Sequence, residues 1–565
     1  MRTGAAVATA GLILGTMAGP TTAAPAAIAG PSHPPEGASS AGTAAGDASG
    51  DGTEVRSRAV PATPDATPDG TPDGTPAPTG RVRTVAELAP VRTDPFALLG
   101  VTWAPGPVPS GLQVEVRVHT TAGWGDWQPI EQDSGHAPSA VEDAEVRAGT
   151  APLWVGSADG VAVRLKSASA GGLADVQVVT VDPGPDPAAT GLSAAGPLDQ
   201  ARPTSGDRLK GSPNFPQQPA IISRRQWGAD RSLVEPCFSP RYGSMAKMVF
   251  VHHTAGANSY SARESPAIVR SILAYHTRGQ NWCDIGYNAL IDRFGNIYAG
   301  RRGGLRKPVR GAHAGDFNVN TVGVSLMGNF ETAEPSRRIR RALVRFVGWR
   351  LGTSFTPVRG RVRVEGERFA RISGHRDAMS TACPGRNAYD RLPGIRDRVE
   401  RYLRDYRPAA ERKTDRLGRD RTGPVFVGEQ RSHGGKYTRF AHGRMYVKRG
   451  GRPHWLTGRV LKRYRAEDGV VGALGWPRSD IHRSSVGRAR LISFKRGRMY
   501  VPPGKRIREL HGRVLDRYGR LGFARGRLGL PTSSIQRIRG GQKATFRGGA
   551  IRWDRSSDSF VVTFR

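Results

Sequence analysis

The chain has 565 residues and a formal net charge of +36, with 84 Lys and Arg against 48 Asp and Glu. This length allows several domains, each large enough for a core of its own. Beyond the N-terminus no apolar stretch reaches the ~20 residues of a membrane-spanning helix, which excludes a multi-span membrane protein.

The N-terminus predicts export. One positive charge at Arg2 precedes an apolar stretch from Gly4 to Ala18 and then small residues, the pattern of a secretory signal peptide over residues 1–24. A membrane anchor is the alternative, although the apolar stretch is short for one. We therefore expect a secreted protein, extracellular or cell-wall associated, with no transmembrane segment after signal cleavage.

Charge is divided unevenly along the chain. Residues 1–206 hold 11 basic against 21 acidic side chains, whereas the remainder holds 73 against 27. A surface as basic as that of the second part attracts anionic polymers. For an exported protein these are anionic cell-envelope polymers rather than nucleic acid. The alternative is that the arginines reflect a composition bias and mainly serve solubility.

Two segments rich in Ala, Gly, Pro, Ser and Thr, residues 25–80 and 183–215, predict linkers, the first of them disordered. Between them, residues 81–182 favour a β-rich accessory domain, a small sandwich of short strands separated by Gly and Pro turns. This domain contains no cluster of reactive side chains, so its role stays open. The expected strands cover residues 96–103, 114–118, 124–127, 153–155, 161–165 and 176–181.

Residues 216–406 show mixed α and β patterns, which predict an α/β domain with a central sheet covered by helices. We expect strands at 249–251, 287–292, 297–300 and 322–327, and helices at 265–277, 337–352 and 391–406.

After a linker at 407–424, the segment 425–565 repeats itself. Leu456-Thr-Gly-Arg-Val-Leu returns as Leu510-His-Gly-Arg-Val-Leu after 54 residues, and Leu474-Gly-Trp-Pro returns as Leu528-Gly-Leu-Pro at the same spacing. A fixed period marks an array of similar units. These units resemble LGFP repeats, modules of actinobacterial cell-envelope proteins, and the resemblance implies envelope attachment.

Three cysteines in an exported chain cannot all pair with one another. Cys383 stands eight residues after His375, and the apolar run 248–251 ends in His252 and His253. Two imidazoles and one thiolate can hold zinc and leave its fourth position open for water, the layout of a hydrolytic site. Neighbouring residues of a strand point to opposite faces, so only one of the two adjacent histidines reaches the metal.

Residues 221–404 resemble the peptidoglycan recognition protein family, the amidase-2 type of N-acetylmuramoyl-L-alanine amidase. The resemblance implies a mixed β-sheet with flanking helices, bound Zn²⁺, and hydrolysis of the amide between N-acetylmuramic acid and L-alanine in peptidoglycan. The matching segments, in the family's order, are Ile222–Ala229, Val251–Thr254, Asp284–Asp292, Gly295–Arg301, Gly311–Ala314, Val322–Phe330 and Gly374–Gly385.

The resemblance also implies roles for single residues. The zinc ligands fall on His252, His375 and Cys383. Tyr287 would assist proton transfer, and Thr381 would stabilise the oxyanion formed when the amide carbon is attacked.

Some amidases of this type carry a glutamate in the strand corresponding to 322–327. This chain has Ser325 there and no carboxylate, which favours Tyr287 over a glutamate base. We expect His253 in the core or behind the ligands, and Trp227 in the core. The candidates for binding the muramyl peptide are His276, Arg301, His313 and Asn329, and structural hydrogen bonding is the alternative role for the two histidines.

The remaining cysteines, Cys237 and Cys283, are expected to form a disulfide. It would close a loop of ~45 residues, worth roughly 3–4 kcal/mol in the chain-entropy model. This pairing would account for the odd number of cysteines.

Three functions remain open at this point. The first is a secreted zinc amidase, and the second is a non-catalytic peptidoglycan-binding recognition protein anchored to the envelope. The third is a structural envelope protein in which the repeats dominate. Non-catalytic members of the family typically lack the cysteine ligand, so Cys383 favours the enzyme.

Overall fold

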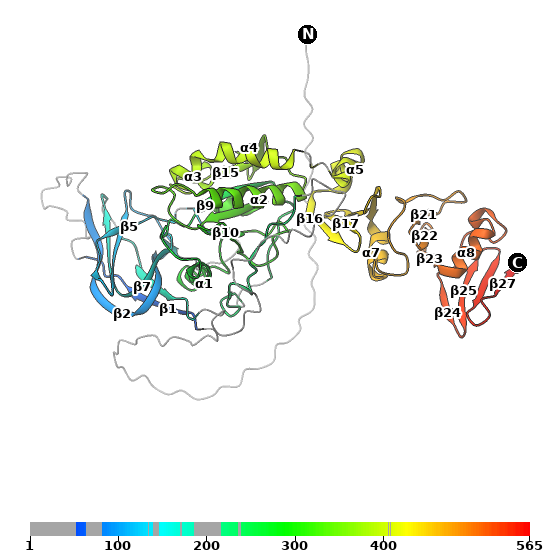
Figure 1. Cartoon of the computed structure of the whole chain (residues 1–565), viewed down its shortest axis with the longest axis horizontal. Helices are drawn as coiled ribbons and strands as arrows, with labels where there is room; N and C mark the ends of the chain where they lie inside the picture. The colour runs from blue at the N-terminus through cyan, green and yellow to red at the C-terminus, as the bar shows by residue number, and fades with distance from the viewer. Residues whose placement is uncertain are drawn as a thin grey trace, which may run out of the picture. The chain divides into compact units, whose positions relative to one another are not determined.

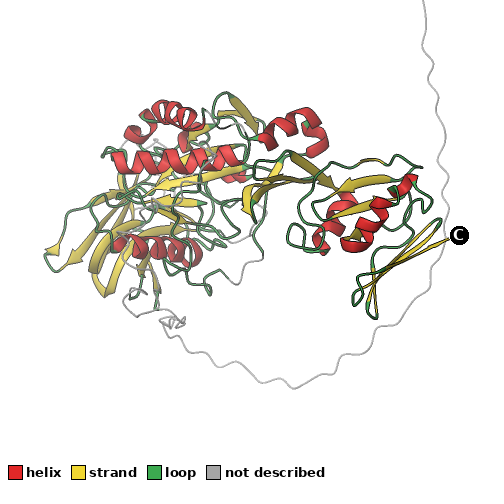
Figure 2. Cartoon of the chain, turned by 45° about the vertical axis from the view of Figure 1, so that its right-hand side comes forward, coloured by secondary structure: helices red, strands yellow, loops and turns green. Residues whose placement is uncertain are grey.

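A computed structural model describes residues 52–63, 82–133, 135–138, 146–169, 172–185, 216–234, 239–404, 406 and 408–565. The predicted signal peptide and most of the two predicted linkers lie outside these residues. Figures 1 and 2 show the elements of the chain, which fall into an N-terminal β unit, a central α/β unit and a C-terminal array of small sheets. Among the described helices none is long and apolar enough to cross a membrane.

The N-terminal unit confirms the β-rich prediction but forms one hydrogen-bonded sheet instead of a two-sheet sandwich. Its strands run in the order β1-β8-β2-β7-β3-β4, with β5 on β3 and β6 on β2. The strands are β1 (Glu54–Ala59), β2 (Arg83–Trp103), β3 (Gln113–Thr120), β4 (Gly123–Trp124), β5 (Gln128–Ile130), β6 (Ala148–Gly149), β7 (Leu153–Ser167) and β8 (Gln177–Asp182).

The reason for the single sheet is the length of two strands. β2 and β7 pair along most of their length, with several register shifts that bend them, as their curvature in Figure 1 shows. Bulges of this kind increase local bending. Buried side chains from different strands, such as Val101, Val116 and Val163, therefore pack against each other inside the curved sheet.

One strand lies where the sequence predicts linker. β1 pairs with β8 over six residues, from Glu54 with Asp182 to Ala59 with Gln177. Its side chains are mostly exposed, so it lacks the apolar alternation by which a strand is recognised. The prediction that residues 25–80 are linker throughout is therefore wrong at this strand. Backbone pairing, rather than side-chain burial, holds β1 in the sheet.

The central unit contains a five-stranded mixed sheet in the order β11-β10-β12-β9-β15, as expected. All neighbours are parallel except β10 and β11. The strands are β9 (Met248–His253), β10 (Ala289–Ile291), β11 (Ile297–Ala299), β12 (Thr321–Leu326) and β15 (Ile372–Gly374), beside a hairpin of β13 (Arg361–Val364) and β14 (Glu367–Ala370). The helices are α1 (Glu264–Ala274), η3 (Tyr275–Gly279), η4 (Gly315–Asn318), α2 (Arg337–Thr353), η5 (His375–Asp377), α3 (Arg386–Asp390) and α4 (Leu392–Leu403).

Helices cover both faces of this sheet. α2 and α4 share one apolar cluster with β9, including Val251, Phe346 and Val399, and α1 packs in a second cluster with Leu290. A parallel strand buried on both faces must be apolar at nearly every position, which is why β9 reads as a continuous apolar run. The sheet thus offers only the ends of its strands for polar side chains.

The C-terminal array confirms the repeats. Tyr464 donates to the carbonyl of Gly475 (2.7 Å), and 54 residues later Tyr518 donates to that of Gly529 (2.6 Å). The same tie therefore recurs at the period of the repeats. The elements are β16 (Val425–Ser432), β17 (Gly435–Phe440), β18 (Gly443–Lys448), β19 (Pro453–Thr457), α7 (Gly458–Ala466), β20 (His482–Arg483), β21 (Arg490–Ser493), β22 (Gly497–Val501), β23 (Arg508–His511), α8 (Gly512–Arg520), η6 (Phe523–Arg525), β24 (Gln536–Ile538), β25 (Gly541–Phe546), β26 (Gly549–Asp554) and β27 (Phe560–Phe564).

The segment 407–424, expected as a linker, contains two helices, α5 (Ala409–Leu417) and α6 (Arg419–Thr422). Ala410 is buried in a cluster with Phe355 of the central unit and Phe440 of the first repeat. Burial of one small apolar side chain in a mostly charged segment gives too weak a periodicity for a helix to be predicted from sequence.

The start of α2 offers a test of the fold. Ser336 is its N-cap and accepts a hydrogen bond from the backbone N–H of Ile339 (3.3 Å). We expect Ser336→Ala to lower the stability of the central unit by about 1 kcal/mol. Ser336→Asp should preserve it, because the carboxylate also caps a helix. Thermal unfolding and amide hydrogen exchange in the first turn of α2 measure the effect, and equal stability of the alanine variant and the parent would contradict it.

Candidate metal centre

The three predicted ligands lie at one edge of the central sheet. His252 is near the carboxyl end of β9, and His375 follows directly after β15, which pairs in parallel with β9. Carboxyl ends of neighbouring parallel strands meet at the same edge, where open α/β sheets bind their ligands. The loop between η5 and α3 returns Cys383 to this edge, where its Sγ accepts the backbone N–H of His253 (3.4 Å).

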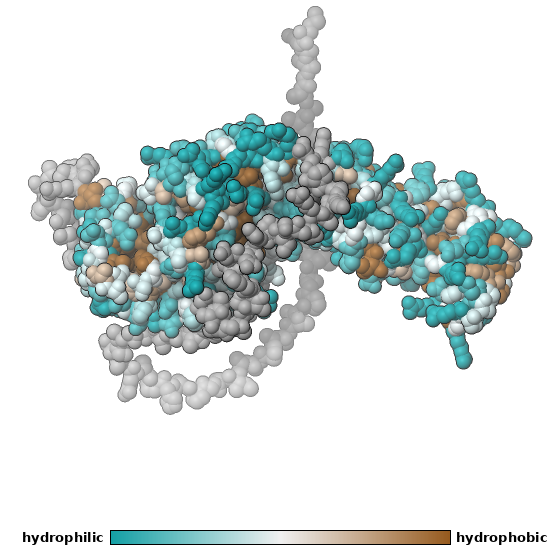
Figure 3. All heavy atoms as spheres, viewed as in Figure 1, coloured by the Kyte–Doolittle hydropathy of each residue, from teal (hydrophilic) through white to brown (hydrophobic). Residues whose placement is uncertain are grey.

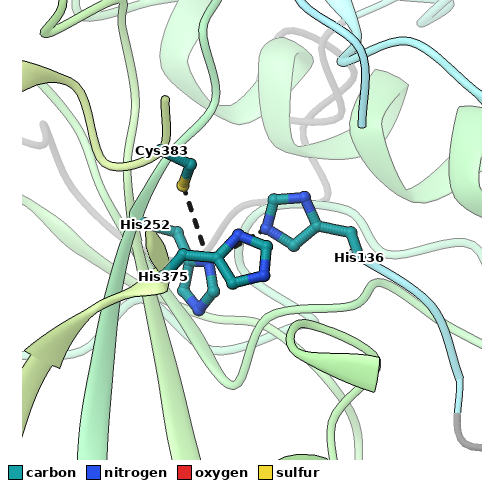
Figure 4. A group of neighbouring side chains, drawn as sticks. All are labelled: His136, His252, His375 and Cys383. Carbon is teal, nitrogen blue, oxygen red and sulfur yellow. Dashed lines mark hydrogen bonds between the residues drawn. The ribbon is translucent and has the colours of Figure 1, made fainter. Parts of the chain in front are cut away.

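A fourth side chain joins them. Candidate ligand atoms of His136, His252, His375 and Cys383 all lie within 4.8 Å of one another. Figure 4 shows these four side chains gathered around one point. Cys383 Sγ is 3.7 Å from His252 Nδ1, and His136 Nε2 is 2.9 Å from the same nitrogen. His136 belongs to the N-terminal unit, in the segment between β5 and β6.

Burial sets the protonation of these groups. It lowers the pKa of His252 and His375 well below the ordinary value, and the neighbouring imidazoles, His136 among them, lower both further. Burial also raises the pKa of the Cys383 thiol well above its usual range. Both imidazoles are therefore neutral and able to coordinate. A divalent cation among them supplies the charge that turns the thiol into a thiolate.

The residues fit a zinc ion. Both ring nitrogens of His375 are buried and neither makes a hydrogen bond of good geometry to a described residue, although the Gly135 backbone is near enough to oppose the lowering of its pKa. A buried polar group without a full partner costs about 1–3 kcal/mol. On its far side, His252 Nε2 lies 3.2 Å from Nδ1 of His313, the kind of outer contact that orients a metal ligand. Imidazole nitrogens with one cysteine sulfur are a donor set typical of zinc.

The two predicted catalytic residues lie beside this cluster. The Tyr287 ring is buried, with its centroid 5.6 Å from that of His252. Burial raises its pKa well above the usual value, so the phenol keeps its proton and can donate a hydrogen bond. The hydroxyl of Thr381 accepts the backbone N–H of Cys383 (3.2 Å) and so fixes the loop that carries the thiol.

The predicted groove histidines are both buried. His276 lies in the π-helical turn η3, stacks on Trp282 with centroids 4.4 Å apart, and accepts the backbone N–H of Gly286 (3.2 Å). Its Nε2 is buried with no partner among the described residues. His313 contacts His252, and burial lowers its pKa to about 3, so it is neutral. In this structure His313 lies behind a candidate ligand.

The other two binding candidates differ from each other. Arg301 is buried and near enough for its charge to depress the pKa values of His276 and His313. Asn329 lies in the turn after β12, and its side chain accepts the backbone N–H of Glu331 (2.9 Å), within its own turn. Of these two residues, Arg301 acts electrostatically on histidines of the site, whereas the Asn329 side chain is bonded only within its own turn.

The residues expected to be structural also have defined positions. Trp227 is fully buried and donates to the carbonyl of Ala299 (2.8 Å). His253 is buried on the opposite side of β9 and lies 3.1 Å from the carboxylate of Glu131.

Cys383 is free, as the sequence predicts. Cys283 is the other cysteine among the described residues. The predicted partner, Cys237, lies outside the described residues, so their pairing stays a prediction.

Sequence reasoning missed the contribution of the N-terminal unit. It found no reactive cluster there, yet Glu131, Asp133 and His136 all face the central unit. The available signal was an acidic pair and a histidine spaced around Ser134-Gly135. Such a pattern is common in surface turns. It indicates a functional site only once the central unit is seen to pack against it.

Three family models match separate parts of the chain. Residues 50–195 match the description Rv3811 N-terminal galactose-binding domain-like, residues 242–386 match N-acetylmuramoyl-L-alanine amidase, and residues 474–526 match LGFP repeat. The last two confirm the resemblances drawn from the motifs, and the first includes β1 in the N-terminal unit.

Similar proteins match the central unit. Peptidoglycan recognition protein 1 of Mus musculus is 34% identical over 170 residues, 30% of this chain and 84% of that protein. Peptidoglycan-recognition protein SC2 of Drosophila melanogaster is 34% identical over 174 residues, with the same two shares. Among solved structures, wild-type Drosophila PGRP-LB is 26% identical and covers 31% of this chain and 92% of its own, with a TM-score of 0.25. The N-acetylmuramoyl-L-alanine amidase LysC from Clostridium intestinale URNW is 20% identical and covers 32% and 99%, with a TM-score of 0.25.

The candidate centre predicts a graded loss of metal affinity. His375→Ala and Cys383→Ala should each weaken zinc binding by more than about 100-fold, because each removes a ligand. His313→Ala should weaken it by about 10–100-fold, as expected for a residue that orients a ligand. Competition titration against a chelating indicator measures this. His482→Ala, on an exposed strand of the repeats, is the control, and an unchanged affinity in the Cys383 variant would contradict the assignment.

Proposed function

The chain belongs to the peptidoglycan recognition protein family, and on that premise we propose that its central unit is a zinc-dependent N-acetylmuramoyl-L-alanine amidase. It would hydrolyse the amide between N-acetylmuramic acid and L-alanine in peptidoglycan. The observation that carries the proposal is the buried thiol of Cys383 beside the buried, neutral imidazoles of His252 and His375. A recognition module that only binds its ligand has no need of such a donor set.

His252, His375 and Cys383 would hold the zinc ion. Bound zinc supplies Lewis acidity, which polarises a substrate carbonyl and lowers the pKa of water toward ~7. The protein's own contribution begins with orientation. His313 fixes the ring of His252 from behind, and the turn closed by Thr381 fixes Cys383.

Tyr287 and Thr381 would act on the reacting amide. The Tyr287 phenol stays protonated, so it can donate to the carbonyl oxygen as negative charge develops and can pass a proton toward the departing L-alanine nitrogen. The Thr381 hydroxyl uses an oxygen lone pair for the Cys383 N–H and keeps its own proton for the same oxyanion. The muramyl peptide would be bound by Arg301, His276 and His313. Asn329, the fourth residue predicted to bind it, lies apart from this site because its side chain is bonded within its own turn.

The second candidate is a peptidoglycan-binding protein without catalysis. It is favoured by the names of the similar mouse and fly proteins, which are recognition proteins. The two functions differ in one product, since only hydrolysis exposes a new amino terminus on L-alanine.

The flanking parts suggest where the protein works. The LGFP match and the basic repeats support an exported protein held at the cell envelope, in contact with anionic envelope polymers. Figure 3 shows mostly hydrophilic side chains on the visible face of the repeats. Export would also allow the proposed disulfide between Cys237 and Cys283 to persist.

Hydrolysis is tested by labelling free L-alanine amino termini after incubating the mature chain with purified peptidoglycan and zinc. We expect release by the parent and none by Cys383→Ala. Binding of walls by both proteins without release from either would favour the recognition protein.

Tyr287→Phe separates catalysis from metal binding. Loss of one donor to a developing oxyanion lowers kcat by about 10²–10³-fold, while zinc content should stay equal to that of the parent. An unchanged kcat would show that the phenol has no part in the reaction, and loss of zinc would mean that Tyr287 supports the metal centre instead.

A further inference from the structure

One side chain of the candidate metal centre does not belong to the central unit. His136 Nε2 lies 2.9 Å from His252 Nδ1, and its ring centroid is 4.3 Å from that of His375. Figure 4 shows the ring reaching in from a separate segment of the chain and facing the other three side chains. These contacts put its nitrogen on the open side of the three-ligand set, where a hydrolytic site binds water.

We propose that His136 is a fourth metal ligand, by which the N-terminal unit closes the centre and holds the enzyme in an inhibited state. A zinc site with four protein ligands is closed, whereas a hydrolytic one keeps a position for water or substrate. The proposal rests on the amidase function proposed above. It assigns a regulatory role to the N-terminal unit, whose contribution to that function was open.

His136 is prepared for coordination by its neighbour. Its Nδ1 is hydrogen-bonded to the carboxylate of Asp133, which leaves Nε2 to face the centre. Metal-bound histidines commonly donate their second nitrogen to a carboxylate in this way. Both side chains are nearly fully buried, with exposed fractions of 7% and 3%. Asp133 also accepts a hydrogen bond from Gln280 of the central unit (3.3 Å).

The backbone around His136 is held by the central unit as well. Asn318 donates its side-chain amide to the carbonyl of Ala137 (2.8 Å). Gly135 has a φ of 83°, and a Cβ at this position would lie 2.6 Å from Cγ of Met379. Only glycine therefore allows this turn to approach so closely. On the other side, the carboxylate of Glu131 contacts His253.

The two units also share a core that does not depend on metal. Leu98 and Val179 of the N-terminal sheet belong to one apolar cluster with Ile272 and Tyr275 of the central unit. The Tyr275 hydroxyl donates to the carbonyl of Thr150 (2.9 Å). This interface keeps His136 at a high local concentration beside the centre. Release then requires only the short turn around His136 to leave, or the N-terminal unit to be removed.

The test uses the full mature chain loaded with cobalt(II), whose visible absorption reports the ligands around the metal, and azide as a small probe of an open position. The parent spectrum should respond to azide only at concentrations about tenfold higher than those that change the spectrum of the His136 variants. His136→Ala should show a changed spectrum, bind one cobalt and respond to azide. It should also hydrolyse peptidoglycan faster, by about tenfold if the parent site is open in roughly a tenth of the molecules.

Two further variants make the result specific. His136→Gln should behave like the alanine variant and replaces it if that protein does not fold. His119→Ala is the matched control, because His119 lies in the same unit and pairs with Asp159 instead of the centre. It should retain the parent's spectrum and rate.

Each contrary outcome has a distinct meaning. An azide response in the parent equal to that of the His136 variants, with equal hydrolysis rates, would overturn the inference and leave the amidase function intact. Loss of cobalt from folded His136 variants would make His136 a structural ligand and also overturn the inhibitory role. An azide response at lower concentration in the variants, with no peptide release from any of the proteins, would overturn the amidase function and the inhibition together.

Discussion

The organisation of the central unit depends on one constraint: three candidate metal ligands are buried without charge at the end of a parallel sheet. β9 is apolar on both faces, so polar groups can occupy only its carboxyl end. The imidazoles of His252 and His375 then lie in surroundings that keep them neutral, and the thiol of Cys383 is held protonated until a cation is present. Metal binding and the stability of this edge are therefore coupled.

The turn that follows α1 connects this centre to the N-terminal unit. In the π-helical turn η3, Tyr275 and His276 are adjacent, and the wider turn directs them to different surroundings. The first enters the core shared with the N-terminal sheet, and the second lies near Tyr287 in the candidate site. π-helical turns are often found at functional sites because they redirect side chains in this way. The turn η3 therefore contacts both the N-terminal unit, through Tyr275, and the candidate site, through His276.

The C-terminal repeats follow a different principle. The array has three small sheets, and one internal hydrogen bond recurs in it, from Tyr464 to Gly475 and from Tyr518 to Gly529. Their cores are built mainly from near neighbours in sequence, as in other repeat arrays.

Sequence patterns alone predicted the elements with strong periodicity, such as β9 and α2, the period of the repeats, and the proximity of His252, His375 and Cys383. These features depend on local pattern or on motifs that keep their order along the chain. The sequence could not determine β1, whose exposed side chains carry no pattern and whose place comes from pairing with β8.

The presence of His136 beside these three side chains became visible only in the folded structure. His136 lies 116 residues from His252 in sequence, and nothing in its local sequence distinguishes it from a histidine in a surface turn. Its position depends on the docking of two separately patterned units, and on Asp133 fixing which nitrogen faces the centre. Contacts between folded units depend on the shapes of both surfaces, which a linear pattern does not contain.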